Sequence, residues 1–107
     1  FDNTTSATDD RKTLLNDYKL YQNFPNPFNP STIITYRLPE QNNVTLRIYD
    51  TLGQEIKTLV ESFQSAGEYS TVWNGCDNLD NPVSSGIYFY KLETENYNQY
   101  KKMVLMK

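Results

Sequence analysis

The sequence predicts an all-β fold, an antiparallel β-sandwich of about seven short strands. Several segments alternate apolar and polar residues with the period of two that is typical of strands, and turn signals recur about every ten residues. No segment shows convincing helical periodicity. Aromatic residues make up 14% of the 107 residues and hydrophobic residues only 37%, so we expect one domain with a core built largely from rings.

Residues 1–17 are predicted to be a flexible linker from a larger precursor. They are mostly Asp, Asn, Thr and Ser, with Leu14 and Leu15 as a neighbouring apolar pair, so they bury too little surface to offset the entropy cost of ordering. The chain begins at Phe1 with neither a Met nor a basic leader, which favours a piece of a longer protein. Residues 18–107 are predicted to form the folded domain.

Residues 18–31 are predicted to be a stiff, extended segment at the edge of the sandwich. Pro25, Pro27 and Pro30 each fix their own φ and keep the preceding residue extended, which excludes a helix. Phe24 and Phe28 are expected to anchor this segment to the core. A polyproline ligand for a partner is the weaker alternative, because burial explains the interleaved aromatic residues better.

Two strands are predicted between residues 32 and 48, joined by a short polar loop at residues 40–43. Their apolar residues fall at every second position: Ile34, Tyr36, Leu38, Val44, Leu46 and Ile48. The simplest interpretation is an antiparallel pair. A turn at residues 50–53 follows, with Gly53 expected at a positive φ. In the next strand, residues 54–61, Leu59 interrupts the alternation and predicts a β-bulge.

Three further strands complete the predicted fold. The first begins at Gly67, the second covers residues 87–94 after a long polar loop that Gly86 ends, and the third covers residues 99–106. Inward positions are expected at Tyr69, Thr71, Trp73, Tyr88, Tyr90 and Leu92. The number of strands and the buried Trp favour an immunoglobulin-like sandwich, without the disulfide of antibody domains because the chain has one Cys.

The last predicted strand is apolar on both faces. Met103 and Leu105 lie on one face, and Val104 and Met106 lie on the other. A strand that can bury both faces is either central in its sheet or has a free edge to which a partner strand can bind.

The composition argues against several function classes. A net charge of −3 without a basic stripe excludes a nucleic-acid partner. With no His and the single Cys76, the usual zinc, haem and Cys–His arrangements lack their parts, so no cofactor and no enzyme activity are predicted. Asp77 and Asp80 are the nearest carboxylate pair, but they share one loop. A calcium site there lacks the bidentate Glu, and an Asx turn explains the loop better.

Five motifs occur in order along the chain, at residues 24–32, 46–55, 73–75, 85–92 and 101–107. In this order, and ending at the last residue, they resemble the type A C-terminal sorting domain of proteins exported by the type IX (Por) secretion system. The resemblance covers residues 18–107. This chain has Asn74 and Asp80 where the family commonly has Asp and Gly. Asp tolerates positive φ, so Asp80 is expected to keep the turn. The immunoglobulin-like domain of flagellar hook-capping proteins shares some of these motifs.

The resemblance implies a non-catalytic secretion and sorting signal. Such domains direct an attached cargo across the periplasm and outer membrane of Bacteroidetes-like bacteria, so the protein would be secreted or displayed at the cell surface. The implied partners are outer-membrane components of the type IX system, a sortase-like peptidase and a covalently fused cargo domain upstream. The peptidase typically removes the domain and attaches the cargo to anionic lipopolysaccharide. Cleavage is then expected before Tyr18, where the chain is accessible.

The predicted secretion signal is the final segment: Lys101, Lys102, Met103, Val104, Leu105, Met106 and Lys107. Strand addition at this segment would supply backbone hydrogen bonds, while its lysines would fix the orientation. An ordinary closing strand is the alternative. The remaining motif residues are expected to be structural: Pro25, Asn26, Pro27, Phe28, Gly53, Trp73, Asn74, Gly75, Gly86 and Tyr88.

Two other functions stay open at this point. Exposed tyrosines such as Tyr97 and Tyr100 could stack on sugars, which would make the domain an accessory polysaccharide-binding module of a secreted enzyme. Its mark would be a row of aromatic rings on one solvent-facing surface, whereas most rings here fall on inward positions. A structural spacer is the other option. Exposed strand edges would also permit a strand-swapped dimer.

Overall fold

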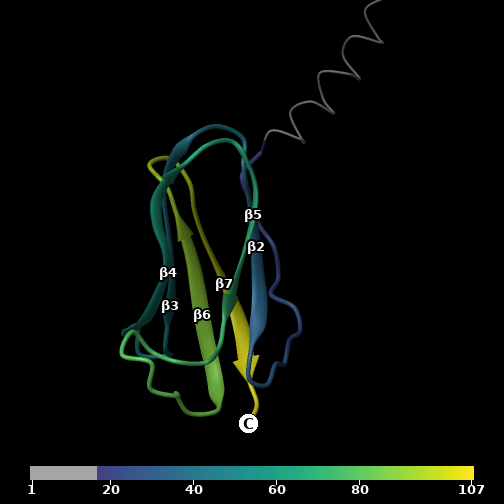
Figure 1. Ribbon diagram of the computed structural model, residues 1–107, viewed down its shortest axis with the longest axis vertical. Helices are drawn as coiled ribbons and strands as arrows, with labels where there is room; N and C mark the ends of the chain where they lie inside the picture. Colours follow the sequence, from purple (N-terminus) through teal and green to yellow (C-terminus); the bar gives the residue numbers. More distant parts are fainter. Residues whose placement is uncertain (1–16) are drawn as a thin grey trace, which may run out of the picture.

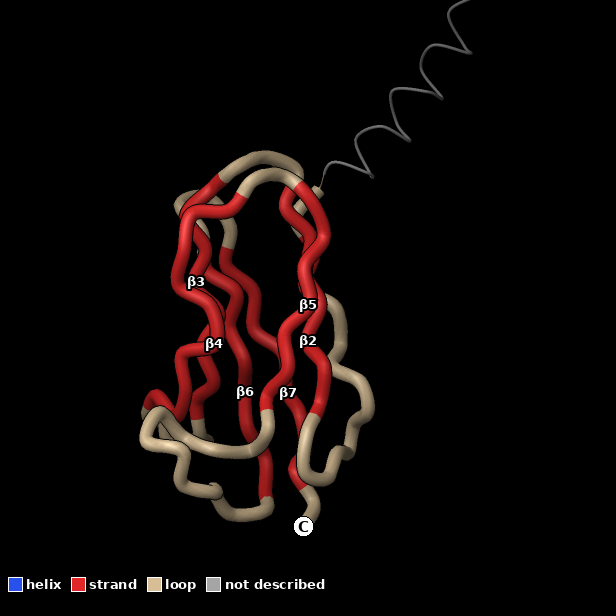
Figure 2. Tube along the Cα trace, viewed as in Figure 1, coloured by secondary structure: helices blue, strands red, loops and turns tan. Residues whose placement is uncertain are grey.

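The computed structural model describes residues 17–107, so the predicted linker lies outside the described residues except for Asp17. The described part contains seven strands: β1 (Lys19–Leu20), β2 (Thr32–Leu38), β3 (Asn42–Tyr49), β4 (Glu55–Gln64), β5 (Gly67–Trp73), β6 (Gly86–Glu93) and β7 (Asn98–Leu105). They form two antiparallel sheets, with the orders β1-β2-β5 and β4-β3-β6-β7, which face each other (Figures 1 and 2). The predicted all-β antiparallel sandwich is confirmed.

The core lies between the two sheets and is filled by every second residue of the long strands. Its buried apolar side chains are Leu20, Phe28, Ile34, Tyr36, Leu38, Val44, Leu46, Ile48, Trp73, Tyr88, Tyr90, Leu92, Met103 and Leu105. Nearly all of the predicted inward positions are in this set, and Tyr69 packs against it. Each such side chain contributes about 1.5–3 kcal/mol through burial, so the alternation in the sequence is what holds the sheets together.

The expected pairing of the strands on either side of residues 39–41 is wrong. β2 pairs with β1 and β5, whereas β3 pairs with β4 and β6. The loop therefore crosses from one sheet to the other, and β2 and β3 face each other across the core instead of lying side by side (Figure 1). Both arrangements bury the same alternate residues, so the periodicity alone does not distinguish them.

The predicted bulge in β4 is confirmed. Leu46 pairs with Val60 and Arg47 pairs with Thr58, which leaves Leu59 as the extra residue on β4. An extra residue increases the local twist and bends the edge strand.

The two loops that begin with Asp50 and Asp77 are Asx turns. The Asp77 carboxylate accepts hydrogen bonds from the backbone N–H groups of Leu79 and Asn81, at 2.9 and 3.0 Å. Asp80 has a φ of 65°, and Gly53 occupies the matching position of the other loop with a φ of 84°. The expectation that Asp80 keeps the turn is thus confirmed, and the carboxylate of Asp77 serves the loop itself.

Metal-binding clusters of His, Cys, Asp and Glu do not occur within residues 17–107. The described residues also include no helix that is long and apolar enough to span a membrane.

Candidate functional site at the terminal strand

The predicted secretion signal forms the second half of β7 and the two residues that follow it. Met103 and Leu105 point into the core and are almost completely buried. Lys102, Val104 and Met106 alternate with them on the other face, where the Met106 side chain is 55% exposed. β7 is the outermost strand of its sheet and pairs with β6 alone in the strand order. The central position that two apolar faces allowed is therefore excluded.

A proline-containing segment covers the outer edge of β7. We call residues 22–30 the proline strap; it runs beside β2 and the lower end of β7 in Figure 1. The Phe28 N–H donates to the Val104 carbonyl at 3.0 Å, and the Met106 N–H donates to the Phe28 carbonyl at 2.9 Å. The Val104 N–H donates to the Asn26 Oδ1 at 2.9 Å. The edge of β7 is thus already hydrogen-bonded from Val104 to Met106.

Only one of the two strap phenylalanines anchors the strap. Phe28 is 2% exposed, and its ring lies 5.6 Å from that of Trp73, measured between centroids. Phe24 is 76% exposed, so its predicted anchoring role is wrong. Its backbone exchanges hydrogen bonds with Ile33, whose side chain points away from the core. Paired residues on neighbouring strands share a face, and Phe24 therefore follows Ile33 to the solvent side.

The predicted motif at residues 73–75 packs under the strap. The Trp73 Nε1–H donates to the Cys76 carbonyl at 2.9 Å, and the Asn74 Oδ1 accepts from the Cys76 N–H at 3.2 Å. Gly75 has a φ of 76°, and a Cβ there would lie 3.1 Å from the Pro30 carbonyl oxygen. Glycine is required because the loop has a left-handed backbone and touches the strap.

The start of β6 holds the end of the chain from the other side. Gly86 is in register with Leu105, and Tyr88 is in register with Met103. The Tyr88 ring meets Trp73 edge-on, with 5.3 Å between the centroids. The Lys107 N–H donates to the Ser85 Oγ at 3.0 Å. The strap, the loop at residues 73–75 and the start of β6 therefore converge on the terminal strand, whereas Gly53 lies in the turn after β3, outside this group.

A buried polar network, which the sequence did not suggest, ties the strap to the core. Asn23 and Thr32 are buried, and the Asn23 Nδ2 donates to the Thr32 Oγ1 at 2.9 Å. The Tyr90 hydroxyl accepts from the Asn23 N–H at 2.8 Å and donates to the Tyr21 carbonyl at 2.7 Å. A tyrosine predicted to point inward implies a buried hydroxyl that needs partners, and this was the available signal.

This network predicts a loss of stability at high pH. Burial raises the pKa of Tyr90 to about 12, and the hydrogen bond from Asn23 lowers it in part. Burial also raises the pKa values of Tyr36 and Tyr88. The unfolded chain, with phenol pKa values near 10, loses these protons first, so the contribution is complete below about pH 10 and is lost as pH rises towards 12. A shift of about two units in Tyr90 corresponds to about 2–3 kcal/mol.

Urea unfolding at a series of pH values from about 8 to 11.5 would measure this effect. Tyr90→Phe, which cannot ionise at that position, is expected to be less stable at neutral pH and to lose less stability above pH 10. Equal pH slopes for the two proteins would contradict the assignment to Tyr90.

The lysines of the terminal segment have different environments. Lys102 and Lys107 are exposed, and Lys101 is half-buried. The ion pairs among the described residues, which involve Arg47, Lys57 and Lys91, do not include any of these three lysines. Lys102 and Lys107 therefore keep their charges available for an external group.

The two tyrosines considered for sugar stacking also differ. Tyr97 is half-buried and stacks on Tyr18 with 4.9 Å between the ring centroids, so its expected exposure is wrong. Tyr100 is 57% exposed on the outer face of β7, and the Lys91 Nζ lies 5.3 Å from its ring centroid.

Comparison with known proteins identifies a sequence family. The family model of the FlgD Ig-like domain matches residues 28–98, which is more than half of the chain. This match confirms that the sandwich is immunoglobulin-like. The comparison with curated proteins found no match.

Solved structures with a similar fold include three bacterial proteins. Dimeric latent PorU from Porphyromonas gingivalis is 20% identical over 84% of this chain, with a TM-score of 0.64. PorZ from the same organism, described as an essential surface component of the type IX secretion system, is 20% identical over 87%, with a TM-score of 0.56. FlgD from Xanthomonas campestris, a protein of flagellar hook capping, is 20% identical over 89%, with a TM-score of 0.57.

These similarities concern the fold alone. The chain spans 9% of the length of PorU, 12% of PorZ and 71% of the Xanthomonas FlgD chain. The PorU and PorZ matches are therefore to one small part of a much larger protein.

Proposed function

Because the chain belongs to the family of FlgD Ig-like domains, we propose that residues 18–107 are a non-catalytic C-terminal sorting domain. In this proposal the domain directs an attached cargo through the periplasm and across the outer membrane by the type IX secretion system. The cargo is then secreted or displayed at the cell surface. The fold similarity to parts of PorU and PorZ supports a link with this system.

The convergence of separate motifs on the terminal strand carries the proposal. Phe28, Gly75 and Gly86 come from three distant segments, and all three lie against the last residues of the chain. Burial of Met103 and Leu105 fixes the strand, so the alternate side chains are presented in one defined arrangement. This arrangement, in which separate motifs hold the terminal strand in place, is expected of a domain whose receptor recognises that strand.

The covered edge changes the expected mode of recognition. Strand addition at Val104–Met106 would have to displace the proline strap, because the strap already occupies the backbone groups of this edge. We therefore propose that a receptor reads the outward side chains, Lys102, Val104, Met106 and Lys107. Two unpaired cations and two apolar groups could match a partner surface that combines acidic residues with an apolar patch.

The implied partners follow from this proposal. They are outer-membrane components of the type IX system, a cargo domain fused upstream and a sortase-like peptidase. The peptidase would cut before Tyr18, in a segment that lies almost entirely outside the described residues.

A reporter fusion would test the export function. The full chain is fused to the C-terminus of a passive periplasmic reporter and expressed in a type IX competent host and in an isogenic strain that lacks the translocon. We expect protease-accessible reporter at the surface of the first strain and periplasmic reporter in the second. Periplasmic reporter in both strains would contradict the proposal.

A structural role of the kind found in hook-capping proteins is the second candidate. The family match itself favours it, because the matched family is named for FlgD. The same fusion separates the two functions, since a structural domain gives no translocon-dependent surface display.

A further inference from the structure

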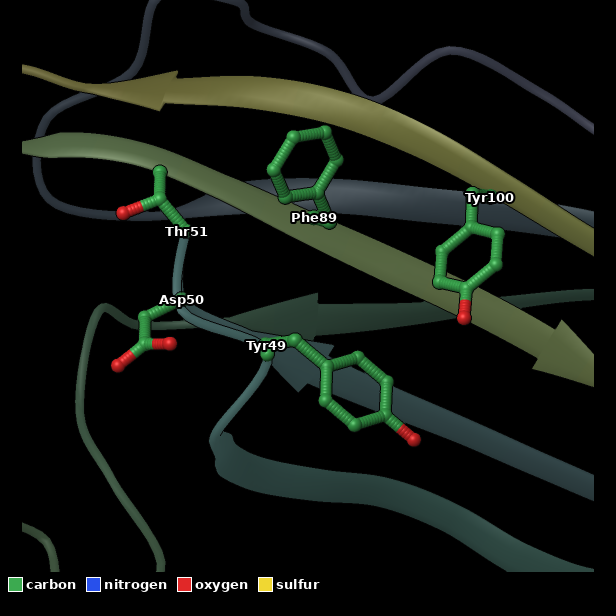
Figure 3. Close-up of a pocket in the computed structure, with 6 residues that line it drawn as sticks. Tyr49, Asp50, Thr51, Phe89 and Tyr100 are labelled. Carbon is green, nitrogen blue, oxygen red and sulfur yellow. The ribbon is translucent and has the colours of Figure 1, made fainter.

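A pocket opens on the outer face of the four-stranded sheet, away from the core and the strap. Its volume is about 380 Å³, and it is lined by Tyr49, Asp50, Thr51, Gly53, Phe89 and Tyr100. Figure 3 shows three aromatic rings that come from β3, β6 and β7, next to the turn after β3. A group of aromatic rings on one solvent-facing surface is the feature expected of a sugar-binding module. The sequence did not predict it here, because the rings lie on three separate strands.

Strand pairing brings the rings together. Tyr49 is in register with Phe89, and Tyr100 is in register with Lys91, two residues further along β6. Cross-strand pairing accounts for the neighbouring positions of Tyr49 and Phe89. It does not account for Tyr100, which keeps 57% of its surface exposed. The pocket thus offers an aromatic surface that stays largely exposed, although the Lys91 Nζ lies 5.3 Å from the Tyr100 ring centroid.

Polar groups at the rim of the pocket are held in place and can still form hydrogen bonds with a ligand. The Asp50 Oδ1 accepts from the N–H groups of Leu52 and Gln54, both at 2.9 Å, so the turn and the carboxylate are held in place. No hydrogen bond within residues 17–107 involves the Asp50 Oδ2, the Thr51 hydroxyl, or the hydroxyls of Tyr49 and Tyr100. Donors and acceptors therefore surround an apolar floor.

We infer that this pocket is a binding site for one unit of a neutral saccharide. A pyranose ring has an apolar face of C–H groups that packs on aromatic rings, and a rim of hydroxyls that exchange hydrogen bonds with hydroxyl and carboxylate groups. The volume is within the range of small-molecule pockets, about 300–1,000 Å³. The lining holds one carboxylate, Asp50, and no Lys or Arg. The cation beside the Tyr100 ring, the Lys91 Nζ, pairs with the Glu93 carboxylate at 3.7 Å, so the pocket offers an anionic sugar a repelling carboxylate and no free cation in its lining.

This site goes beyond export and could act together with it. The pocket shares β7 with the outward face proposed to be read during secretion. Lys102, Val104 and Met106 are not among its lining residues, although Lys102 is in register with Phe89 and so adjoins the pocket. A sorting domain that stays attached to its cargo would then also hold polysaccharide.

Binding can be measured by NMR titration of the full chain with cellohexaose and mannohexaose, and with a hexamer of galacturonic acid as the anionic probe. We expect at least one neutral hexamer to shift the amide signals of Tyr49–Gly53, Phe89 and Tyr100. Tyr100→Ala should weaken this binding about tenfold, and Tyr100→Phe should retain most of it, because the ring supplies most of the contact. The matched control is Phe24→Ala, which removes another exposed ring, 76% exposed against 57% for Tyr100, outside the pocket lining and should leave the affinity unchanged.

Thr51→Val, which leaves all three rings in place, should weaken binding about threefold through loss of one hydrogen bond. This second variant keeps the test decisive if Tyr100→Ala fails to fold. The inference would be overturned if neither neutral hexamer binds, if only the galacturonate hexamer binds, or if Tyr100→Ala or Thr51→Val leaves the affinity unchanged. None of these outcomes bears on the export fusion, which tests the other function.

Discussion

Replacing Phe28 by Ala is expected to lower the free energy of unfolding by about 3–5 kcal/mol. Phe28 is 2% exposed, and its ring packs against Trp73, so truncation removes buried apolar surface and leaves a cavity where the strap meets the core. Domains of this size are stable by about 5–15 kcal/mol, so the loss is a large part of the total. Urea unfolding followed by the fluorescence of Trp73 would measure it.

Phe24→Ala is the matched control for this substitution. It removes the same side chain four residues earlier in the same strap, but from a position that is 76% exposed. Surface substitutions of this kind usually change stability by less than about 0.5 kcal/mol. Equal losses for the two variants would contradict the assignment of Phe28 as the anchor.

Phe24 and Phe28 also show which property of the strap could not be predicted from the sequence, namely which of the two rings is buried. Each phenylalanine lies next to one proline and one asparagine, and this local pattern does not predict which ring is buried. The orientation of the Phe24 side chain is set by the β-bridge to Ile33, and that of Phe28 is set by the β-bridge to Leu105. The first contact joins residues nine positions apart and the second joins residues 77 positions apart. Neither contact follows from the alternation of Phe and Pro, so the orientation of each ring depends on pairing that the local pattern does not contain.

Alternation within single strands was the most informative part of the sequence. It placed Ile34, Leu46 and Tyr90 in the core, and it located the bulge at Leu59, because burial of one sheet face requires a period of two and an extra residue breaks it. The same pattern could not assign β2 and β3 to different sheets. Either sheet buries the same residues, and the choice depends on pairing with later strands, β5 for β2 and both β4 and β6 for β3.

The terminal strand was predicted as an element but not in its surroundings. Two apolar faces suggested a central strand or an open edge, and the structure has an edge strand whose last residues are covered by the strap. Asn26 and Phe28 of the strap form the hydrogen bonds that cover this edge. These bonds join distant parts of the sequence: Asn26 and Val104, for example, are 78 residues apart. For the same reason the aromatic pocket of Tyr49, Phe89 and Tyr100 could not be foreseen.

Changing the outward side chains of the terminal strand is expected to abolish export without unfolding the domain. The variant combines Lys102→Gln, Val104→Thr, Met106→Gln and Lys107→Gln, and it keeps the core residues Met103 and Leu105. The strap bonds to Val104 and Met106 use their backbone groups, so they are retained. Loss of an interface hot spot costs about 2 kcal/mol or more, which is about a thirtyfold loss of affinity for the receptor.

Deleting residues 101–107 would be a poorer experiment. It removes Met103 and Leu105 from the core and exposes the aromatic cluster around Trp73, so a loss of export could reflect unfolding alone. A better control is Glu68→Gln with Val72→Thr on β5, where Val72 is an exposed apolar residue of the other sheet.

The most direct test of the proposed signal is the fraction of reporter that reaches the cell surface with the fourfold variant, compared with the unchanged chain and the β5 control. Urea unfolding of each purified domain establishes that all three are folded. The account predicts surface reporter for the unchanged chain and the β5 control, and retained periplasmic reporter for the fourfold variant. Full surface display of a folded fourfold variant would contradict it.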